Sequence, residues 1–479
     1  MKNLFNDDTI TAISTPVGKS GIGIVRLSGK RSLQVAEKIF IAANGKRLCE
    51  LPSHSMQYGW IVENSKLKIQ NSKLKKKENK EAQIIDEVLL TVMRAPRTYT
   101  REDIVEINCH SGIVVLKRIL ELVLRKGARL AVPGEFTKRA YINGRIDLAQ
   151  AEAVLDVINS KSELALKAAL AQLQGKLSKK IRALRKSLLE ILAQLEASID
   201  FSDQEIGLDP SQKLLKRIAG IHKDLDELLR NAQTGMILRE GITCVICGRP
   251  NVGKSSLLNA LLKKERAIVT AVPGTTRDIL EETLDLFGIP LLLIDTAGII
   301  KWSNLAEKEA VRRSKQSINE ASMVLLVVDA SQKLSSEDYK ISRANAKKPA
   351  FVLLNKCDLP PRVDIMKAQR LMPGRQVLRI SALRGTGLDR LKEELAKSIW
   401  QGKASSNGEV LITNLRHARA LKKAKRLLLS SIKAIKEAQG AEIVALEVKQ
   451  AQEALGGIVG EIGCEDVLSE IFSQFCIGK

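Results

Sequence analysis

The chain has 479 residues, 44% of them hydrophobic, which is enough for two to four domains with apolar cores. No run of 18 uninterrupted apolar residues occurs, and the opening MKNLFNDDTI lacks the apolar core of a signal peptide, so we expect a cytoplasmic protein without a membrane partner. The formal net charge of +23 predicts a polyanionic partner such as RNA, although solvated basic faces would give the same value.

Residues 1–130 combine short β-rich runs, GIGIVRLS, EVLLTVM and DIVEINC, with one helical pattern in VVLKRILELVLRKG. This mixture predicts an α+β N-terminal domain. Within it, residues 64–80 form the polar, low-complexity segment NSKLKIQNSKLKKKENK. We interpret this lysine-rich segment, which ends near residue 83, as a surface insertion without a catalytic role.

Helical periodicity begins near residue 145, because apolar residues recur at steps of three and four along 181–199 and 214–229. We assign 131–238 to the first part of an all-α helical domain and 403–479, where the pattern resumes, to its second part. Strand and helix patterns alternate between these parts, so residues 239–402 predict an inserted, doubly wound α/β domain. An insertion must leave the helical domain intact, so we expect its two ends to lie close together.

The most informative motif of the inserted domain is GRPNVGKSS at 248–256, which follows the apolar run GITCVI. It matches Gly-x-x-x-x-Gly-Lys-Ser, the phosphate-binding loop that joins a strand to a helix. Gly248 and Gly253 let successive N–H groups point toward phosphates. Lys254 is expected to reach the β- and γ-phosphates, and Ser255 offers a hydroxyl group to Mg²⁺.

Three further motifs follow in the order that a guanine-nucleotide switch requires. Asp295 begins DTAG after the run IPLLLI, where a carboxylate can hold the water shell of Mg²⁺. Asp358 ends NKCD after the run AFVLL, and its two oxygens can accept from the ring N–H and the amine of guanine. The tripeptide SAL at 381–383 closes that pocket. The residues expected to contact GTP are Asn251, Val252, Gly253, Lys254, Ser255, Ser256, Thr270, Thr275, Thr276, Asp295, Thr296, Ala297, Gly298, Asn355, Lys356, Asp358, Ser381, Ala382 and Leu383.

The position that carries a water-orienting glutamine in Ras-like proteins is Ile299 in this chain. Glu307, the nearest carboxylate downstream, could polarise the attacking water, or it could be a solvated glutamate on a helix face. Asn251 could hold a monovalent cation beside the phosphates, or it could simply form a turn. Cys244 and Cys247 lie in the predicted first strand, and we interpret them as strand residues because no second pair completes a metal site.

Four segments give a family resemblance. GTTRD at 274–278 is similar to the Era, EngA and TrmE class of GTPases. DTITAISTPVGKSGIGIVRLSG at 8–29, PGEFTKRAYINGRIDLAQAEAV at 133–154 and the final IFSQFCIGK resemble the tRNA-modification GTPase family known as MnmE or TrmE. This resemblance spans nearly the whole chain.

The resemblance implies a second site in the N-terminal domain, for 5-formyl- or methylene-tetrahydrofolate, at Arg26, Glu106, Arg145 and Lys479. An arginine suits the glutamate tail of the folate, and Glu106 suits the donor-rich edge of the pterin. Cys476 is a candidate thiol beside this one-carbon donor, with its role open. The alternative for Cys476 is a small buried apolar side chain.

The resemblance further implies a potassium-stimulated, homodimeric GTPase that acts on carbon 5 of the tRNA wobble uridine. An FAD- and NADH-dependent partner, joined in a heterotetramer, would help to install an aminomethyl or carboxymethylaminomethyl group. The implied residues are Ser255 and Thr276 for Mg²⁺, Asn251, Thr270, Val272 and Thr275 for K⁺, Glu307 for the attacking water, and Lys254 for the phosphates.

Two alternative functions remain open at this point. One is a ribosome-assembly switch of the Era or EngA type, which should carry a KH-like RNA module or a second G domain. Neither is evident in the sequence. The other is a GTP-regulated, RNA-binding scaffold that has no chemistry of its own.

Overall fold

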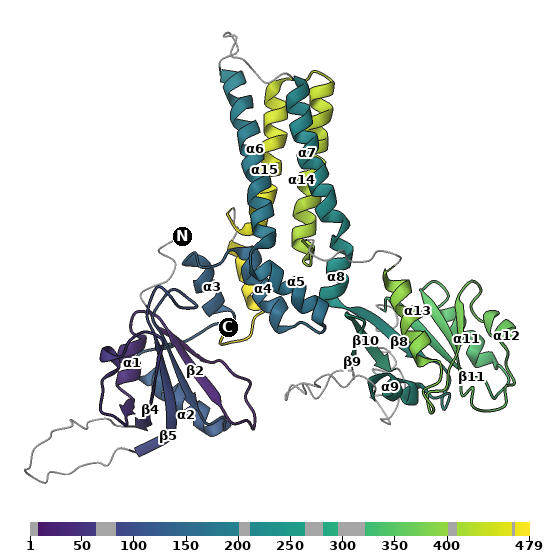
Figure 1. The fold of residues 1–479 in the computed structure, drawn as a ribbon, viewed down its shortest axis with the longest axis horizontal. Coiled ribbons are helices and arrows are strands. Elements are labelled where there is room, and N and C mark those ends of the chain that lie inside the picture. Colours follow the sequence, from purple (N-terminus) through teal and green to yellow (C-terminus); the bar gives the residue numbers. More distant parts are fainter. Residues whose placement is uncertain are drawn as a thin grey trace, which may run out of the picture. The chain divides into compact units, whose positions relative to one another are not determined.

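The computed structural model describes residues 8–63, 83–200, 211–263, 281–295, 321–400, 410–461 and 465–479 (Figure 1). The chain divides into two compact units, residues 1–155 with 459–479 and residues 156–458. Residues 131–155 and 459–479, which we assigned to the helical domain, thus belong to the first unit with the N-terminal strands. Within the described ranges, no helix is long and apolar enough to cross a membrane.

The N-terminal part of the first unit is an α+β fold, as predicted. Its seven-stranded sheet has the order β3-β4-β5-β6-β2-β1-β7, with antiparallel neighbours except for the parallel pair β1 and β7. The elements are β1 (Ile10–Ile13), β2 (Gly23–Ser28), α1 (Ser32–Glu37), β3 (Phe40–Ala42), the 3₁₀ turn η1 (Leu48–Glu50), β4 (Ser55–Glu63), β5 (Gln83–Met93), β6 (Ile104–Cys109), α2 (Ile113–Arg125) and β7 (Arg129–Leu130).

Helix α2 packs on this sheet because its apolar side chains form one stripe. Leu116 and Ile119 are buried and join Val25 and Leu27 of β2 in a single core. Side chains alternate between the two faces of a strand, so Arg26 lies on the face of β2 opposite that core. Arg26 can therefore contact residues on the face of the sheet that α2 does not cover.

Among its described residues, the first unit also contains the helices α3 (Glu135–Ile142), most of α4 (Leu148–Ile158) and α16 (Glu465–Ser473). Gly134, immediately before α3, has a φ of +69°, and a Cβ there would lie 2.6 Å from the carbonyl oxygen of Phe472. Only glycine permits this conformation and approach without strain. The end of α16 is therefore held against the start of α3.

The second unit contains the predicted helices, α5 (Glu163–Leu173), α6 (Lys176–Asp200), α7 (Ser211–Arg230), α8 (Ala232–Glu240), α14 (Leu415–Lys436) and α15 (Ala441–Val459). Helices α6, α7, α14 and α15 run side by side as a bundle (Figure 1). A Cβ on Gly235 of α8 would lie 2.3 Å from the carbonyl oxygen of Ile412. The chain thus leaves and re-enters the helices at neighbouring points, as expected for an inserted domain.

The inserted α/β domain is confirmed as well. Its sheet has the order β13-β12-β11-β8-β10-β9, and only β9 is antiparallel to its neighbour. The elements are β8 (Ile242–Cys247), α9 (Lys254–Lys263), β9 (Glu281–Leu286), β10 (Ile289–Asp295), β11 (Met323–Asp329), α11 (Ser336–Ala344), β12 (Ala350–Asn355), α12 (Ile365–Gln369), β13 (Gln376–Arg379) and α13 (Leu388–Trp400).

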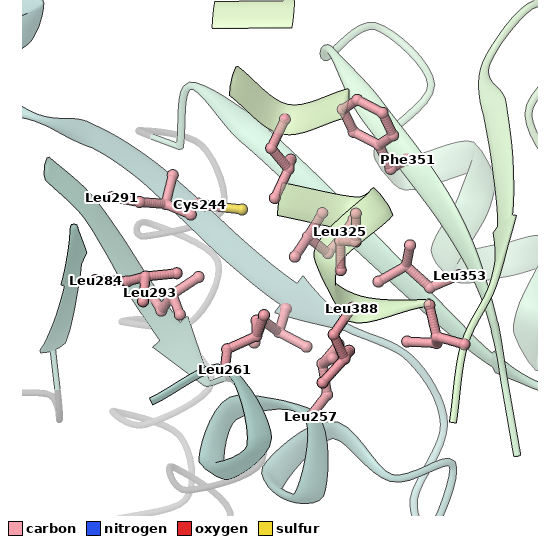
Figure 2. Packing of buried hydrophobic residues seen from close by; sticks show 14 of the residues in the cluster. Cys244, Leu257, Leu261, Leu284, Leu291, Leu293, Leu325, Phe351, Leu353 and Leu388 are labelled. Carbon is pink, nitrogen blue, oxygen red and sulfur yellow. The ribbon is translucent and has the colours of Figure 1, made fainter. Parts of the chain in front are cut away.

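Buried apolar side chains hold this sheet between its helices. Figure 2 shows Leu257 and Leu261 of α9 and Leu388 of α13 facing strand residues such as Cys244 and Leu325. The parallel strands β8, β11, β12 and β13 end at one edge of the sheet. Ligands of open α/β sheets bind outside such carboxyl ends, so the loops that follow these strands define the candidate nucleotide site.

Candidate functional site

The loop between β8 and α9 has the backbone of a phosphate-binding loop. Gly248 has a φ of +149°, and a Cβ there would lie 2.3 Å from the carbonyl oxygen of Val327 on β11. Asn251 adopts a left-handed conformation with a φ of +62°, and Gly253 has a φ of +95°. These turns curl the chain ahead of α9, so that N–H groups at the start of that helix can face an anion.

Lys254 and Ser255 begin α9 at the predicted positions. The Lys254 ammonium donates hydrogen bonds to the carbonyl oxygens of Gly248 (2.9 Å) and Arg249 (2.7 Å), and the side chain is 7% exposed. These bonds hold the cation within the loop, beside the expected position of the phosphates. Ser255 and Ser256 are exposed on the first turn of α9.

Asn355, at the end of β12, joins two parts of the nucleotide site. Its amide nitrogen donates to the carbonyl oxygen of Val252 (2.8 Å), and its amide oxygen accepts from the N–H of Ala382 (2.9 Å). The side chain is 2% exposed. Because a buried amide with both partners is fixed in place, Asn355 sets the position of the phosphate loop relative to the SAL loop.

The predicted base-recognition residues lie together at the ends of β12 and β13. The Ser381 hydroxyl donates to a carboxylate oxygen of Asp358 (2.5 Å) and lowers the pKa of that exposed carboxyl. Lys356 has a φ of +62° and pairs with Asp329 at the end of β11 (2.7 Å). Leu383 is 86% exposed at the rim. Asp358 is thus kept ionised, as an acceptor for a donor-rich base must be.

Several predicted switch residues lie outside the described residues. They are Thr270, Val272, Thr275, Thr276, Thr296, Ala297, Gly298 and Glu307. The backbone of Asp295 ends β10, which pairs with β8 through Asp295 and Ile246. That register brings Asp295 to the same edge of the sheet as the phosphate loop.

Cys244 and Cys247 are buried in β8, as the strand interpretation requires. Burial raises the pKa of the Cys247 thiol to about 12 and raises the pKa of Cys244 as well. Among the described residues, no group of three His, Cys, Asp or Glu side chains could hold a metal ion. Both thiols are therefore packing groups.

In the first unit, Arg26 and Glu106 are direct neighbours on β2 and β6. The Arg26 Nε lies 2.7 Å from a Glu106 oxygen, and the two side chains are 18% and 21% exposed. Arg26 also lies over the ring of Phe136, 5.7 Å from its centroid. The pair is partly open to solvent and sits beside an aromatic surface, which suits an extended ligand with both rings and charges.

The C-terminal segment reaches this pair. The Gly478 carbonyl oxygen accepts from Arg26 (3.3 Å) and from the Ser14 hydroxyl (3.3 Å). The N–H of Phe136, in α3, donates to the Lys479 carbonyl oxygen (3.2 Å). Lys479 is thereby held near Arg26. Cys476 is exposed, which excludes the alternative of a buried apolar side chain.

Arg145 approaches the same region from the turn after α3. Its guanidinium lies 4.8 Å from the centroid of the Tyr99 ring, and the Tyr99 hydroxyl bonds to the Thr137 hydroxyl (2.9 Å). Burial raises the pKa of Tyr99, while the nearby charges of Arg145 and Arg26 oppose that rise. Tyr99 and Phe136 are not among the residues predicted from the sequence, although Phe136 lies within PGEFTKRAYINGRIDLAQAEAV.

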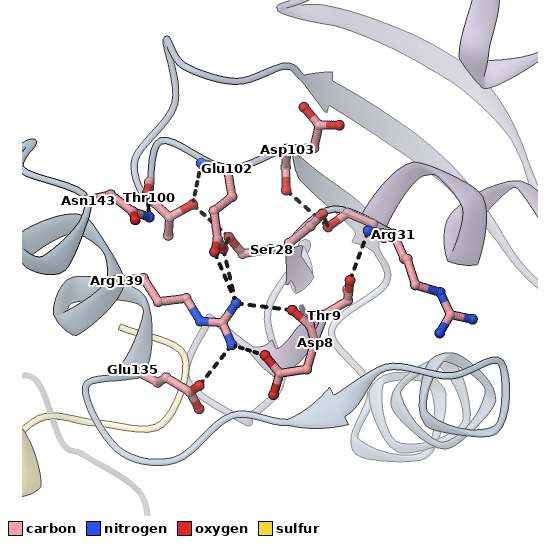
Figure 3. Close-up of polar contacts among 12 residues, drawn as sticks. Asp8, Thr9, Ser28, Arg31, Thr100, Glu102, Asp103, Glu135, Arg139 and Asn143 are labelled. Carbon is pink, nitrogen blue, oxygen red and sulfur yellow. Dashed lines mark hydrogen bonds and ion pairs between the residues drawn. The ribbon is translucent and has the colours of Figure 1, made fainter. Parts of the chain in front are cut away.

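A second arginine network centres on Arg139 of α3 (Figure 3). Arg139 of α3 is 1% exposed and contacts Asp8 (2.7 Å), Glu102 (3.2 Å) and Glu135 (3.0 Å). Burial alone would raise the pKa values of Asp8 and Glu135, but hydrogen bonds from Arg129 and Arg139 outweigh it and lower both. The network fixes α3, and through α3 it fixes Phe136.

Comparisons with known proteins match nearly the whole chain. The model of the MnmE helical domain matches residues 148–476, and the model of the GTP-binding protein TrmE N-terminus matches residues 9–145. The tRNA modification GTPase MnmE of Alkaliphilus metalliredigens is 46% identical, covering 99% of this chain and 100% of the relative. The MnmE of Bacillus subtilis is 42% identical, covering 98% and 100%.

Among solved structures, the G domain of the T. maritima FeoB iron transporter is 27% identical, with a TM-score of 0.26. It covers 33% of this chain and 97% of that structure. A TM-score this low carries no argument about the fold.

Proposed function

The chain belongs to the MnmE (TrmE) family of tRNA modification GTPases, and from this premise we propose that it hydrolyses GTP in order to modify carbon 5 of the tRNA wobble uridine. The family match supports the tRNA-modification part of the proposal. The observation that carries the GTP-hydrolysis part is the buried bridge of Asn355 between the phosphate loop and the SAL loop. It supports a single guanine-nucleotide site, because it joins the element that would hold phosphates to the element that would hold the base.

The chemistry of hydrolysis follows from the residues around this bridge. N–H groups at the start of α9 and the Lys254 ammonium would stabilise charge on the β- and γ-phosphates. Ser255 and Thr276 would hold Mg²⁺, and Asn251, Thr270, Val272 and Thr275 would hold K⁺. These ions would supply the positive charge that an arginine finger supplies in other GTPases. Glu307 would orient the attacking water.

The N-terminal region would bind 5-formyl- or methylene-tetrahydrofolate. Two guanidinium groups, Arg26 and Arg145, and the Lys479 ammonium suit the carboxylates of a folate tail, and Glu106 suits the donors of a pterin ring. The rings of Tyr99 and Phe136 add an apolar surface beside both arginines. Bound folate would supply the one-carbon unit, and the role of Cys476 there stays open.

The remaining parts of the proposal concern partners. We infer that the protein acts in the cytoplasm as a homodimer, together with an FAD- and NADH-dependent partner in a heterotetramer. The added group would be aminomethyl or carboxymethylaminomethyl. Faster GTP hydrolysis in potassium than in sodium buffer would support the K⁺ site, and equal rates would contradict it.

The nucleotide site is tested by changing the base it accepts. In Asp358→Asn, an amide donor faces the position where guanine carries its amine, so GTP affinity should fall while xanthosine triphosphate affinity rises, because xanthine carries an acceptor there. Asp364→Asn is the matched control, since Asp364 is an exposed cap of α12 that asparagine can replace. An unchanged preference in Asp358→Asn would contradict the assignment.

The complete reaction is tested by reconstitution. Purified protein, a flavin-dependent partner, folate, GTP and unmodified tRNA should together yield modified uridine. Omission of GTP or folate should abolish the product. Product formation without GTP hydrolysis would overturn the proposed coupling.

A further inference from the structure

Helix α14 carries an unusual excess of positive charge. Its 22 residues include eight lysines and arginines and no aspartate or glutamate. The neighbouring helix α15 has one lysine and three glutamates in 19 residues. Helices α6 and α7 carry six and five lysines and arginines, but each also carries three acidic residues, so α14 has the largest net positive charge of the four. The basic residues of α14 are Arg416, Arg419, Lys422, Lys423, Lys425, Arg426, Lys433 and Lys436.

Most of this charge lies on one exposed face of α14. With 100° between successive helical residues, Arg419, Lys422, Lys423, Arg426 and Lys433 fall within about 100° of one another. All five are exposed. They form a row about 21 Å long, at a rise of about 1.5 Å per residue, which we call the α14 basic face.

The acidic residues of neighbouring α7 do not neutralise this face. Asp226 pairs with Lys425, which lies beside the row rather than in it. Asp224 pairs with Lys180 of α6. Within the described part of the chain, Arg419, Lys422, Lys423 and Arg426 form no ion pair, and Lys433 meets only Glu437 at the end of the helix (3.6 Å).

Uncompensated like charges in one row repel each other and lower the free energy of unfolding, so the packing of the bundle does not explain them. The cations occupy successive helical turns from Arg419 to Arg426 and appear again at Lys433, and such a row matches a polyanion with regularly spaced charges. We propose that the α14 basic face binds the phosphate backbone of RNA. This inference rests on the proposed function, in which tRNA is the substrate, and it names the surface that holds the RNA.

Phosphate contacts of this kind position an RNA without reading its sequence. Binding should therefore depend steeply on salt and weakly on base identity. The aromatic content of 3% agrees with recognition through charge rather than through stacked bases. Nucleotide binding at the inserted domain needs none of these side chains.

The test compares two triple variants of equal charge. Lys422→Gln, Lys423→Gln and Arg426→Gln remove three charges from the α14 basic face. Lys176→Gln, Lys179→Gln and Lys186→Gln remove three exposed charges from α6 of the same bundle. Affinity for an unmodified tRNA transcript is measured from 50 to 300 mM salt, a range over which the Debye length shortens by a factor of roughly 2.5. GTP hydrolysis without RNA verifies that each variant is folded.

The α14 variant should bind tRNA at least about tenfold more weakly at 0.1 M salt. Its plot of log affinity against log salt concentration should be less steep, with a slope smaller in magnitude by about two to three. The affinity of the α6 variant should stay near that of the wild type. Equal losses in both variants would overturn the proposal, because they would indicate net charge rather than a surface. Unchanged binding in both would overturn it too. The proposed function is judged separately, by the modified uridine that the wild-type protein yields on reconstitution.

Discussion

The nucleotide site and the N-terminal arginine region are built in opposite ways. The nucleotide site consists of backbone turns that one buried side chain, Asn355, ties together. The N-terminal region consists of side chains that converge from β2, β6, α3 and the C-terminal segment, with Arg26 and Glu106 as its centre. A loop fixed by short-range conformation leaves a compact motif in the sequence, whereas a convergence of distant side chains leaves none.

The N-terminal region also separates two kinds of arginine. Arg139 is buried, with carboxylates at three points of its guanidinium, and Arg26 is partly exposed, with a single carboxylate and an aromatic ring. The first arrangement is already satisfied by the protein. The second has donors to spare for a ligand, so the two arginines should respond differently to substitution.

The largest effect is expected from removing the buried arginine. Arg139→Met removes the cation shared by the buried Glu135 and the partly exposed Asp8 and Glu102, so the unfolding free energy of the first unit should fall by about 3 kcal/mol. The loss should not be larger, because Arg129 still pairs with Asp8 and Glu135. Calorimetry measures the melting temperature of each unit. Added GTP should raise the melting temperature of the second unit, which contains the nucleotide site, and so identifies which transition belongs to the first unit. Arg31→Met, at an exposed arginine of the same unit, is the control. If Arg139→Met and Arg31→Met lower the unfolding free energy equally, the buried network of Arg139 does not stabilise the first unit more than an exposed arginine does.

In the nucleotide site, the strongest test is the bridge itself. Asn355→Ala removes the hydrogen bonds to Val252 and Ala382, and GTP affinity should fall about 100-fold, or about 2.7 kcal/mol. Titration calorimetry with GTP measures the loss. Asn345→Ala removes another buried asparagine of the same domain, at the end of α11, and should leave GTP affinity unchanged. Weakening of equal size in the control would show that Asn355 acts only through stability.

Features set by local sequence could be predicted, whereas features set by contacts between distant residues could not. The order of strands and helices and the phosphate loop were predictable, because periodicity and glycine positions are local signals. The pairing of Arg26 with Glu106 depends on the register of β2 against β6, and the two residues are far apart in the sequence. Tyr99 and Phe136 went unrecognised for that reason. The family resemblance named Arg26 and Glu106, but only the fold explains why they meet.

A smaller effect is expected at the partly exposed pair. Glu106→Gln keeps the shape of the side chain but removes the charge that accepts from Arg26 and from a pterin, so folate affinity should fall about tenfold. The unfolding free energy should change by less than about 1 kcal/mol, because the pair is partly solvated. Glu121→Gln, on the exposed side of α2, is the control. Unchanged folate affinity in Glu106→Gln would remove this residue from the site.

The smallest expected effect is a loss of stability of the first unit at low pH. Asp8 and Glu135 have folded-state pKa values below their ordinary values of 3.8 and 4.5, so each stabilises the first unit when the pH is above those values. As the pH falls through the ordinary values toward the folded ones, the folded state must take up protons that the unfolded state already binds, and this stability is lost. The calorimetric transition of the first unit should therefore shift downward as the pH falls below about 4.5. In Glu135→Gln the shift should be smaller, because one of the two titrating groups is gone, and a shift as large as that of the wild type would assign the acid response to carboxylates outside the Arg139 network.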